Sequence, residues 1–495
     1  MTGASLVQPD HSSTPPSRGG RGAERWLLLL FLLSLVLLNP WVRGDGVGYY
    51  AFVRAPLIEH RLDFQRDYTN ANESFREARL DEHGQPKQIF RTPTGHLDNH
   101  FTVGPAILWT PFLLIAHAGV LLARALGSGI PADGFSTPYR LAIAFATALY
   151  SFLGLLLSFR LARQYVAERW AVLATIAIWW ASSLPVYMYF NPSWSHAHSA
   201  FTAALFVWYW HKTREYRSAF QWFLLAAIAG LMLNVYYANA MLLFILVIEA
   251  ARHDAAAFRD PVHRITRLTQ LFVSHMIFFA TLFVSLLPTF ITRYIIYGSL
   301  FATGYPGIST WHWLSPSFFS VLFSSEHGLF SWTPVLLLAT IGLILFRWRN
   351  PQVGTPLLAA AVAFYIFIAC YPDWAGISSY GNRFFVSLTP LFILGLAVFL
   401  DRFAALFRSQ RAALATATAI LAVFILWNAA FMFQWGSHLI PVRGPISWSE
   451  MLHNQFFVVP RQISSHLQKY LFRRSELMRQ IEDRDIRQLK DQSVQ

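Results

Sequence analysis

The stretch WAVLATIAIWWASSLPVYMYFNPSWSHAHSAFTAALFVWYWH, residues 170–211, decides the fold class because its 42 residues contain no Asp, Glu, Lys or Arg. A helix needs about 20 predominantly apolar residues to cross the hydrocarbon core of a membrane. The stretch is therefore long enough for two spans. Leu184-Pro185 and the polar segment 191–198 interrupt its middle, which predicts two helices separated by a break.

Uncharged stretches bounded by arginines recur along the whole chain. Hydrophobic residues make up 55% of the 495 residues and charged residues 13%, about half the usual charged share of soluble proteins. This composition excludes a soluble multidomain protein, a coiled coil and a disordered chain, and the single cysteine, Cys370, excludes an internal disulfide. Further spans are expected at 26–42, 101–123, 141–159, 218–248 (two short spans), 268–292, 327–346, 350–372, 384–400 and 412–433. The sequence predicts an all-α polytopic membrane protein with eleven or twelve crossings.

The arginines orient this bundle. Fifteen Lys and Arg lie in the loops around 160–169, 212–217, 252–267, 347–349 and 402–411, whereas the opposite loops hold only Arg293 and Arg383. Cytoplasmic loops of membrane proteins carry the excess of Lys and Arg, so the first group is expected in the cytoplasm. The net charge of +13 is thereby explained largely without a nucleic-acid partner.

The distribution of charged and apolar residues also predicts the domain organisation. Residues 1–23 are predicted to be a disordered cytoplasmic tail, 24–433 the transmembrane domain, and 434–495 a polar C-terminal tail with a basic amphipathic helix at 465–489. Residues 43–100 form a long first external loop, in which 47–62 is either an interfacial helix or a helix packed on the bundle.

One predicted span conflicts with the rule that successive loops lie on alternate sides of the membrane. Residues 43–100 are expected outside and 160–169 inside, and two predicted spans lie between them where one is needed. We therefore expect that 101–123 does not cross fully and that the loop 127–138 is external.

Asp45 is the first candidate for chemistry, in the segment Arg43-Gly-Asp-Gly-Val-Gly-Tyr-Tyr50 that follows the first span. A carboxylate at the membrane surface can take a proton from an acceptor hydroxyl. The alternative is an aspartate that caps a glycine-rich turn. Tyr49 and Tyr50 are candidate substrate contacts.

Histidines mark two further clusters. His96, Asp98 and His100 precede the span at 101, where they could bind a phosphate or a metal, or simply form a polar loop. His196 and His198 differ by two positions, which places them on different helix faces and disfavours a two-histidine metal site. A single His196 could bind a substrate phosphate or be structural.

The last cluster combines Arg383 and Tyr380 with Glu326 and His327. A guanidinium at the start of a membrane helix suits a phosphate or an anionic headgroup. Its alternative role is an ion pair with Asp373 or Glu326.

At these clusters the sequence resembles the GT-C-type integral membrane glycosyltransferases, in the bacterial branch related to protein O-mannosyltransferases and lipid A aminoarabinose transferases. Asp45 matches their catalytic-base position, and residues 99–105 (NHFTVGP) stand where a His-Pro-Pro-like element is found. Segments 322–334 and 379–384 resemble uncharacterised bacterial members. The chain has Gly46 where the mannosyltransferases carry the second residue of an acidic pair.

The resemblance implies a sugar donor on a polyprenyl phosphate, used on the external face of a bacterial inner membrane, and an acceptor glycan, lipid or protein. It implies Asp45 as base, a donor phosphate held by Arg383, His196, His100 and His327, and transfer with inversion. Candidate substrate contacts are Tyr49, Tyr50, Glu326, Tyr380 and Asp98. No cofactor is required by the sequence, a divalent cation is compatible with it, and no metal ligands are assigned.

Two other functions stay open on sequence grounds: a lipid-linked glycan transporter or flippase, and a polysaccharide polymerase or ligase. A transporter is expected to show internal repeats and ionisable residues near mid-membrane. The sequence shows no such repeat, and its ionisable residues lie at helix ends.

Overall fold

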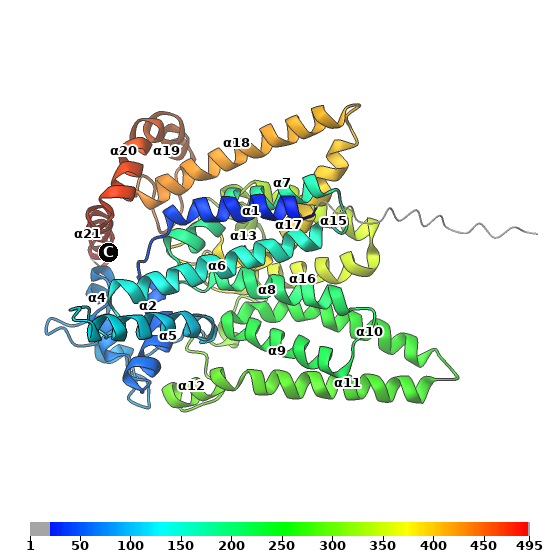
Figure 1. The fold of residues 1–495 in the computed structure, drawn as a ribbon, viewed down its shortest axis with the longest axis horizontal. Helices are drawn as coiled ribbons and strands as arrows, with labels where there is room; N and C mark the ends of the chain where they lie inside the picture. Colours follow the sequence, from blue (N-terminus) through cyan, green and yellow to red (C-terminus); the bar gives the residue numbers. More distant parts are fainter. Residues whose placement is uncertain (1–19, 494–495) are drawn as a thin grey trace, which may run out of the picture.

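The computed structural model describes residues 20–493, which form helices and two isolated bridges but no strand. Most long helices run side by side along the long axis of the molecule (Figure 1). They are α1 (Gly20–Ser34), α6 (Thr137–Ala162), α7 (Glu168–Ala181), α8 (His196–Thr213), α9 (Ala219–Val235), α10 (Phe244–Phe258), α11 (Arg264–Ser285), α15 (Val335–Arg349), α16 (Pro351–Cys370), α17 (Thr389–Ala404) and α18 (Gln410–Gly436). The predicted break inside 170–211 is the segment between α7 and α8, where η4 (Val186–Phe190) lies.

Burial divides these helices into a centre and a rim. In the apolar span Arg383–Ala404, made of η7 (Arg383–Leu388) and α17, 89% of the most apolar 18-residue stretch is buried, and α17 packs against α15, α7 and α6. By contrast the corresponding stretch of α18 is 22% buried and that of α11 only 6% buried. Apolar side chains on a rim of this kind are expected to face lipid, because they would be costly to expose to water.

Six helices of the described chain are long and apolar enough to cross a membrane: α5 (Gly104–Ala125), α6, α11, α16, the η7–α17 span and α18. The remaining stretches predicted as spans carry shorter helices, among them α9 and α15. The all-α polytopic fold class is confirmed, and the number of eleven or twelve crossings stays a prediction.

Many of the shorter elements, together with the longer helices α5 and α21 (Arg474–Ser493), gather at one end of the bundle, at the left of Figure 1. We call this end the cap and define it as residues 43–136 and 437–493. Its helices are α2 (Asp45–Arg54), η2 (Ala55–Glu59), α3 (Gln65–Thr69), α4 (Glu73–Arg79), η3 (Gln88–Phe90), α5, α19 (Trp448–His453), η8 (Asn454–Val458), α20 (Val459–Phe472) and α21. The other short elements are η1 (Leu35–Leu37), η5 (Tyr237–Leu243), α12 (Leu287–Tyr297), η6 (Ile308–Thr310), α13 (Phe318–Phe323) and α14 (Leu329–Trp332).

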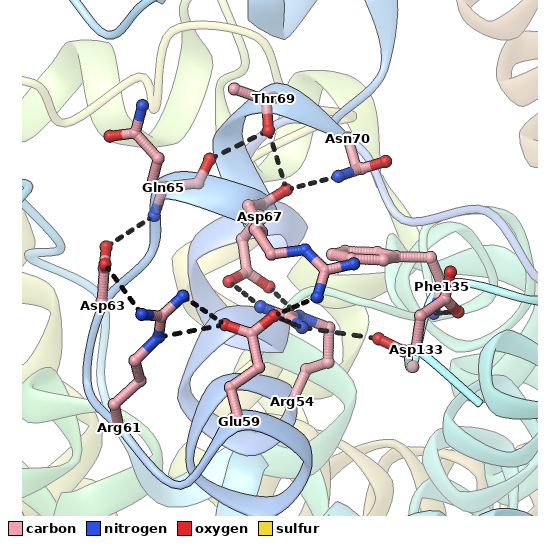
Figure 2. Close-up of polar contacts among 12 residues, drawn as sticks. Arg54, Glu59, Arg61, Asp63, Gln65, Asp67, Thr69, Asn70, Asp133 and Phe135 are labelled. Atoms are coloured by element: carbon pink, nitrogen blue, oxygen red, sulfur yellow. Dashed lines mark hydrogen bonds and ion pairs between the residues drawn. The ribbon is translucent and has the colours of Figure 1, made fainter. Parts of the chain in front are cut away.

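A buried ionic cluster holds the first part of the cap together (Figure 2). Arg54 is fully buried and donates to both carboxylate oxygens of Asp67, at 2.6 and 2.7 Å, and to Glu59 at 2.8 Å. Its guanidinium also lies over the ring of Phe135, 4.3 Å from the centroid. Residues 46–54 of α2 are all buried. Of the two alternatives for 47–62, the structure therefore shows a helix packed on the rest of the protein.

Helix α5 packs against α2 of the segment 43–100. Just before α5 begins, Asn99 donates to the Gly48 carbonyl at 2.9 Å and so holds the end of that segment to its start. Beyond the end of α5, Tyr50 donates to the Gly134 carbonyl and Arg54 to that of Asp133. The loop 127–138 thus lies on the same side as 43–100, which agrees with the expectation that 101–123 does not cross fully.

Within the cap, the C-terminal segment 437–493 folds back onto the segment 43–136. Two helices, α20 and α21, separated at Arg473, replace the single helix expected at 465–489. α21 packs against α4, where Glu482 accepts hydrogen bonds from the Asn72 side chain at 3.0 Å and the Ser74 amide at 2.9 Å. At the other terminus, residues 20–23 of the predicted tail form the first turn of α1, and 1–19 lie outside the described residues.

Candidate active site

Asp45 begins α2, and two glycines shape its surroundings. Gly44 has φ of 53°, in the region that favours glycine, and lets the chain turn sharply into the helix. A Cβ on Gly46 would collide with the Ser193 side chain in the break before α8. Close packing against that break therefore explains why a glycine stands at position 46.

Arg383 meets Asp45 across 338 positions of sequence. The Nη1 atom of Arg383 donates to Oδ2 of Asp45 at 2.9 Å, and the side chains are 12% and 31% exposed. The guanidinium lies over Trp194, 4.7 Å from the ring centroid. Its Nε atom is buried and has no hydrogen-bond partner among the described residues.

The sequence left Asp373 or Glu326 as alternative partners of Arg383, but the hydrogen bond of its Nη1 goes to Asp45 instead. Asp373 nevertheless interacts electrostatically with Arg383. Burial raises the pKa of Asp373, and the charge of Arg383 offsets part of that rise. Two carboxylates therefore share the field of one guanidinium.

Asp45 and Arg383 line a cavity of about 610 Å³. One part of its lining is polar and includes Arg43, Asn191, His438 and Asp485. The rest is mainly apolar and comes largely from α18, α20 and α21, with Met432, Phe433, Ile463, Leu467, Leu477 and Ile481. This C-terminal wall was not predicted from the sequence, although the amphipathic pattern at 465–489 indicates an apolar face that must pack against something.

His196 lies next to this cavity but does not line it. It begins α8, is 3% exposed, and stands between Tyr187 and Tyr236, with ring centroids 4.8 and 5.6 Å away. Its Nδ1 atom has no partner in the described structure. His198 is also buried and lies 3.5 Å from Thr147, away from His196.

His327 and Tyr380 make hydrogen bonds that hold the loop before Arg383 in place. The His327 Nδ1 atom lies 2.8 Å from the Ala375 carbonyl oxygen, and its backbone φ is 55°. Tyr380 is buried and donates to Asn428 Oδ1 at 2.7 Å. The Glu326 amide donates to Ser324 Oγ at 3.0 Å. None of these three residues is among those that line the cavity.

Asp98 and His100 form a separate cluster. His100 Nδ1 is 3.2 Å from Asp98 Oδ2, and Tyr297 donates to Asp98 Oδ1. Burial alone would raise the pKa of Asp98, but the hydrogen bonds from His100 and Tyr297 lower it below its usual value. His100 is not among the cavity residues, so the structure does not bring it together with Arg383.

The two candidate tyrosines point to different partners. Tyr49 accepts a hydrogen bond from Ser195 at 2.8 Å and lies within electrostatic range of both Asp45 and Arg383. Tyr50 donates to the Gly134 carbonyl and so holds the loop after α5. Of the two, Tyr49 is the one near the Asp45–Arg383 pair.

Arg293 is the other arginine in the loops expected outside the cytoplasm. Its guanidinium binds backbone carbonyls. It donates to the carbonyls of Asn99, His100 and Phe101 at 2.9, 2.9 and 2.6 Å, and to the Tyr237 hydroxyl. It lies in α12 and is 2% exposed. Its hydrogen bonds are thus used within the protein.

No cluster of three or more His, Cys, Asp or Glu side chains is arranged to hold a metal ion in residues 20–493. The sequence matches no protein-family model and no curated protein.

Its fold is similar to that of solved membrane proteins. One is the archaeal oligosaccharyltransferase AglB from Archaeoglobus fulgidus in complex with an inhibitory peptide and a dolichol-phosphate, at a TM-score of 0.48 and 12% identity, covering 85% of this chain and 56% of that one. Another is ArnT from Cupriavidus metallidurans, bound to undecaprenyl phosphate (TM-score 0.43, 14% identity) and in the apo state (0.44, 12%), each covering 84% of this chain and 72% of that one. This chain spans little more than half the length of AglB.

Proposed function

We propose that the protein is a membrane glycosyltransferase that moves a sugar from a polyprenyl-phosphate donor to an acceptor hydroxyl on the external face. The observation that carries this proposal is the Asp45–Arg383 pair at the polar part of a mainly apolar cavity. Apolar walls suit a long isoprenoid chain, and a guanidinium suits its phosphate. A carboxylate beside that guanidinium supplies the base.

The proposed reaction is a direct displacement. The acceptor oxygen forms a bond to the anomeric carbon while the bond from that carbon to the phosphate oxygen breaks, and the configuration inverts. Oδ2 of Asp45 is held by Arg383, so Oδ1 takes the hydroxyl proton. The lipid phosphate leaves with the electron pair and is stabilised by the positive charge of Arg383.

Arg383 has the hydrogen-bonding capacity for this double role. Nη1 is used on Asp45, whereas Nε is buried without a partner. A buried unpaired donor costs about 1–3 kcal/mol, and a phosphate oxygen would relieve that cost. The indole of Trp194 beneath the guanidinium fixes its plane.

The experiment that tests this function is transfer from a radiolabelled polyprenyl-phosphate sugar in membranes that contain Asp45→Asn. Loss of general-base catalysis should lower the rate by about 10²- to 10⁴-fold at normal expression. Glu82→Gln is the control, since Glu82 lies in the same segment and its side chain is 86% exposed. Undiminished transfer by Asp45→Asn would exclude Asp45 as the base.

The proposed sidedness has its own test. Cys370 is 2% exposed, so it should give little background with a membrane-impermeant maleimide. A cysteine at exposed Glu82 in the 43–100 segment should label from outside intact cells, and one at exposed Arg259, between α10 and α11, should not. The opposite pattern would place the site in the cytoplasm.

A further inference from the structure

A second arginine–carboxylate pair lines the same cavity. Arg43, two residues before Asp45, forms an ion pair with Asp485 of α21, and His438 Nε2 lies 2.9 Å from the other oxygen of that carboxylate. The Arg43 guanidinium lies over Trp41, 4.3 Å from its centroid. Arg43, His438 and Asp485 are all cavity residues.

The two pairs share their construction but differ in how firmly the carboxylate is held. In each, a guanidinium is stacked on an indole and bound to an acid from a distant segment. Asp45 belongs to α2, whose residues 46–54 are all buried. Asp485 belongs to the C-terminal helix α21, where only Glu482 is buried among the residues whose exposure is described. The Asp485 side chain itself is 13% exposed and has two partners, Arg43 and His438, so it would leave Arg43 through a movement of α21 as a whole.

His438 gives an independent indication of a ligand. Its backbone φ is 56°, and its side chain is 7% exposed. Nε2 faces Asp485, but Nδ1 is buried and has no partner in the described structure. An unusual backbone conformation and an unpaired buried nitrogen both cost free energy, and such costs concentrate at binding sites.

The wall beside these residues is apolar and open to the surface. Ile463 and Leu467 of α20 line the cavity and are still 39% and 48% exposed. Phe456 and Phe457 of η8, the element before α20, are more than half exposed. An apolar chain could therefore lie along α20 with one end in the cavity and the other outside it.

We propose that Arg43 and His438 form a second anion subsite, that it takes the headgroup of an anionic lipid acceptor, and that Asp485 occupies it when no lipid is bound. The acceptor assignment rests on the proposed function. With the donor phosphate on Arg383, a lipid headgroup on Arg43 would lie beside Asp45, where a hydroxyl of that headgroup must be to lose its proton. Asp485 then acts as an intramolecular competitor.

The test is lipid binding by the full-length protein in neutral detergent, without any sugar donor. The probe is dioleoyl phosphatidic acid, a phosphate monoester on two acyl chains, compared with dioleoyl phosphatidylcholine. Thermal unfolding is measured at increasing lipid concentration, because a ligand that binds only the folded state raises Tm. Phosphatidic acid is expected to raise Tm and phosphatidylcholine is not.

Three variants separate a binding role from a structural one. Asp485→Asn removes the competitor and should tighten phosphatidic acid binding about tenfold. Arg43→Gln and His438→Gln each remove a charge-assisted hydrogen bond to the headgroup and should weaken binding about tenfold or more. Arg61→Gln is the control, because Arg61 is an external arginine that is 55% exposed. If Asp485→Asn lowers Tm and leaves lipid affinity unchanged, the pair is only a tether for α21 and the proposal is wrong.

This outcome is independent of the glycosyltransferase proposal. Phosphatidic acid binding should persist in Asp45→Asn, which is expected to lose transfer. Transfer with no binding at Arg43 and His438 would overturn the subsite alone. Binding without transfer from any polyprenyl-phosphate sugar would keep the anion subsite and remove the acceptor assignment.

Discussion

Arg54 and Arg383 are arginines that are each paired with an aspartate and largely shielded from solvent, yet their surroundings differ. Arg54 is fully buried and satisfied by Asp67, Glu59 and the Asp133 carbonyl, with Phe135 beneath it (Figure 2). Arg383 makes one hydrogen bond to Asp45, keeps a buried Nε without a partner, and borders a cavity. A buried charge with complete partners joins segments of the fold, whereas one with incomplete partners beside a cavity is placed to bind a ligand.

The largest expected effect comes from breaking the satisfied cluster. Arg54→Met leaves Asp67 buried without its partner, which should cost about 3–5 kcal/mol of stability. The measurement is thermal unfolding of the purified protein, together with transfer per folded molecule, which should stay near the wild-type value. A stable variant that has lost transfer would reverse the roles of the two arginines.

Arg383→Gln should have the opposite effect to Arg54→Met, with transfer lost and stability kept. Removing a charge that stabilises the leaving phosphate should lower transfer by about 10²- to 10³-fold, with Tm close to the wild-type value. Arg383→Lys is the matched variant, because it keeps the charge without the planar fork and should recover part of the rate. A strongly lowered Tm for Arg383→Gln, with normal transfer by the folded fraction, would make Arg383 structural.

Arg293→Gln sharpens the comparison because Arg293 resembles Arg54 in its complete set of partners. The substitution leaves the carbonyls of Asn99, His100 and Phe101 with fewer donors, and about 2–3 kcal/mol of stability should be lost. Thermal unfolding measures this loss, and transfer per folded molecule should change little. A large fall in transfer at unchanged Tm would give Arg293 a role in the reaction.

The smallest effect is expected at Arg61, whose side chain is 55% exposed and pairs with Glu59 at 3.4 Å. Exposed ion pairs contribute about 0–1 kcal/mol, so Arg61→Gln should leave both Tm and transfer nearly unchanged. A loss comparable to that of Arg54→Met would show that the whole ionic cluster, rather than the buried Arg54–Asp67 pair, holds the cap.

The sequence was informative where composition or charge decides the outcome. The uncharged stretches predict the helical membrane bundle, and the arginine bias predicts that Asp45 and Arg383 share one side, where the structure pairs them. The arginine bias could not show that Arg383 lies at the candidate site whereas Arg293 has a structural role. That difference depends on which backbone carbonyls lie within reach of each guanidinium, and these belong to segments far apart in the chain.

The C-terminal wall of the cavity shows the opposite case. An amphipathic pattern predicts that α20 and α21 have an apolar face, but it does not say what that face covers. The answer comes from long-range contacts such as Glu482 with Asn72 and Asp485 with Arg43. Likewise, the polarity of the loops around His100 and His196 could not show that neither side chain lines the cavity.

The most direct test of the account is equilibrium binding of undecaprenyl phosphate to purified Asp45→Asn and Arg383→Gln. In the proposed reaction Arg383 binds the phosphate and Asp45 takes the proton. Asp45→Asn should therefore bind the lipid at least as tightly as the wild-type protein while losing transfer, and Arg383→Gln should lose both. Wild-type binding by Arg383→Gln, or loss of binding confined to Asp45→Asn, would contradict the assignment.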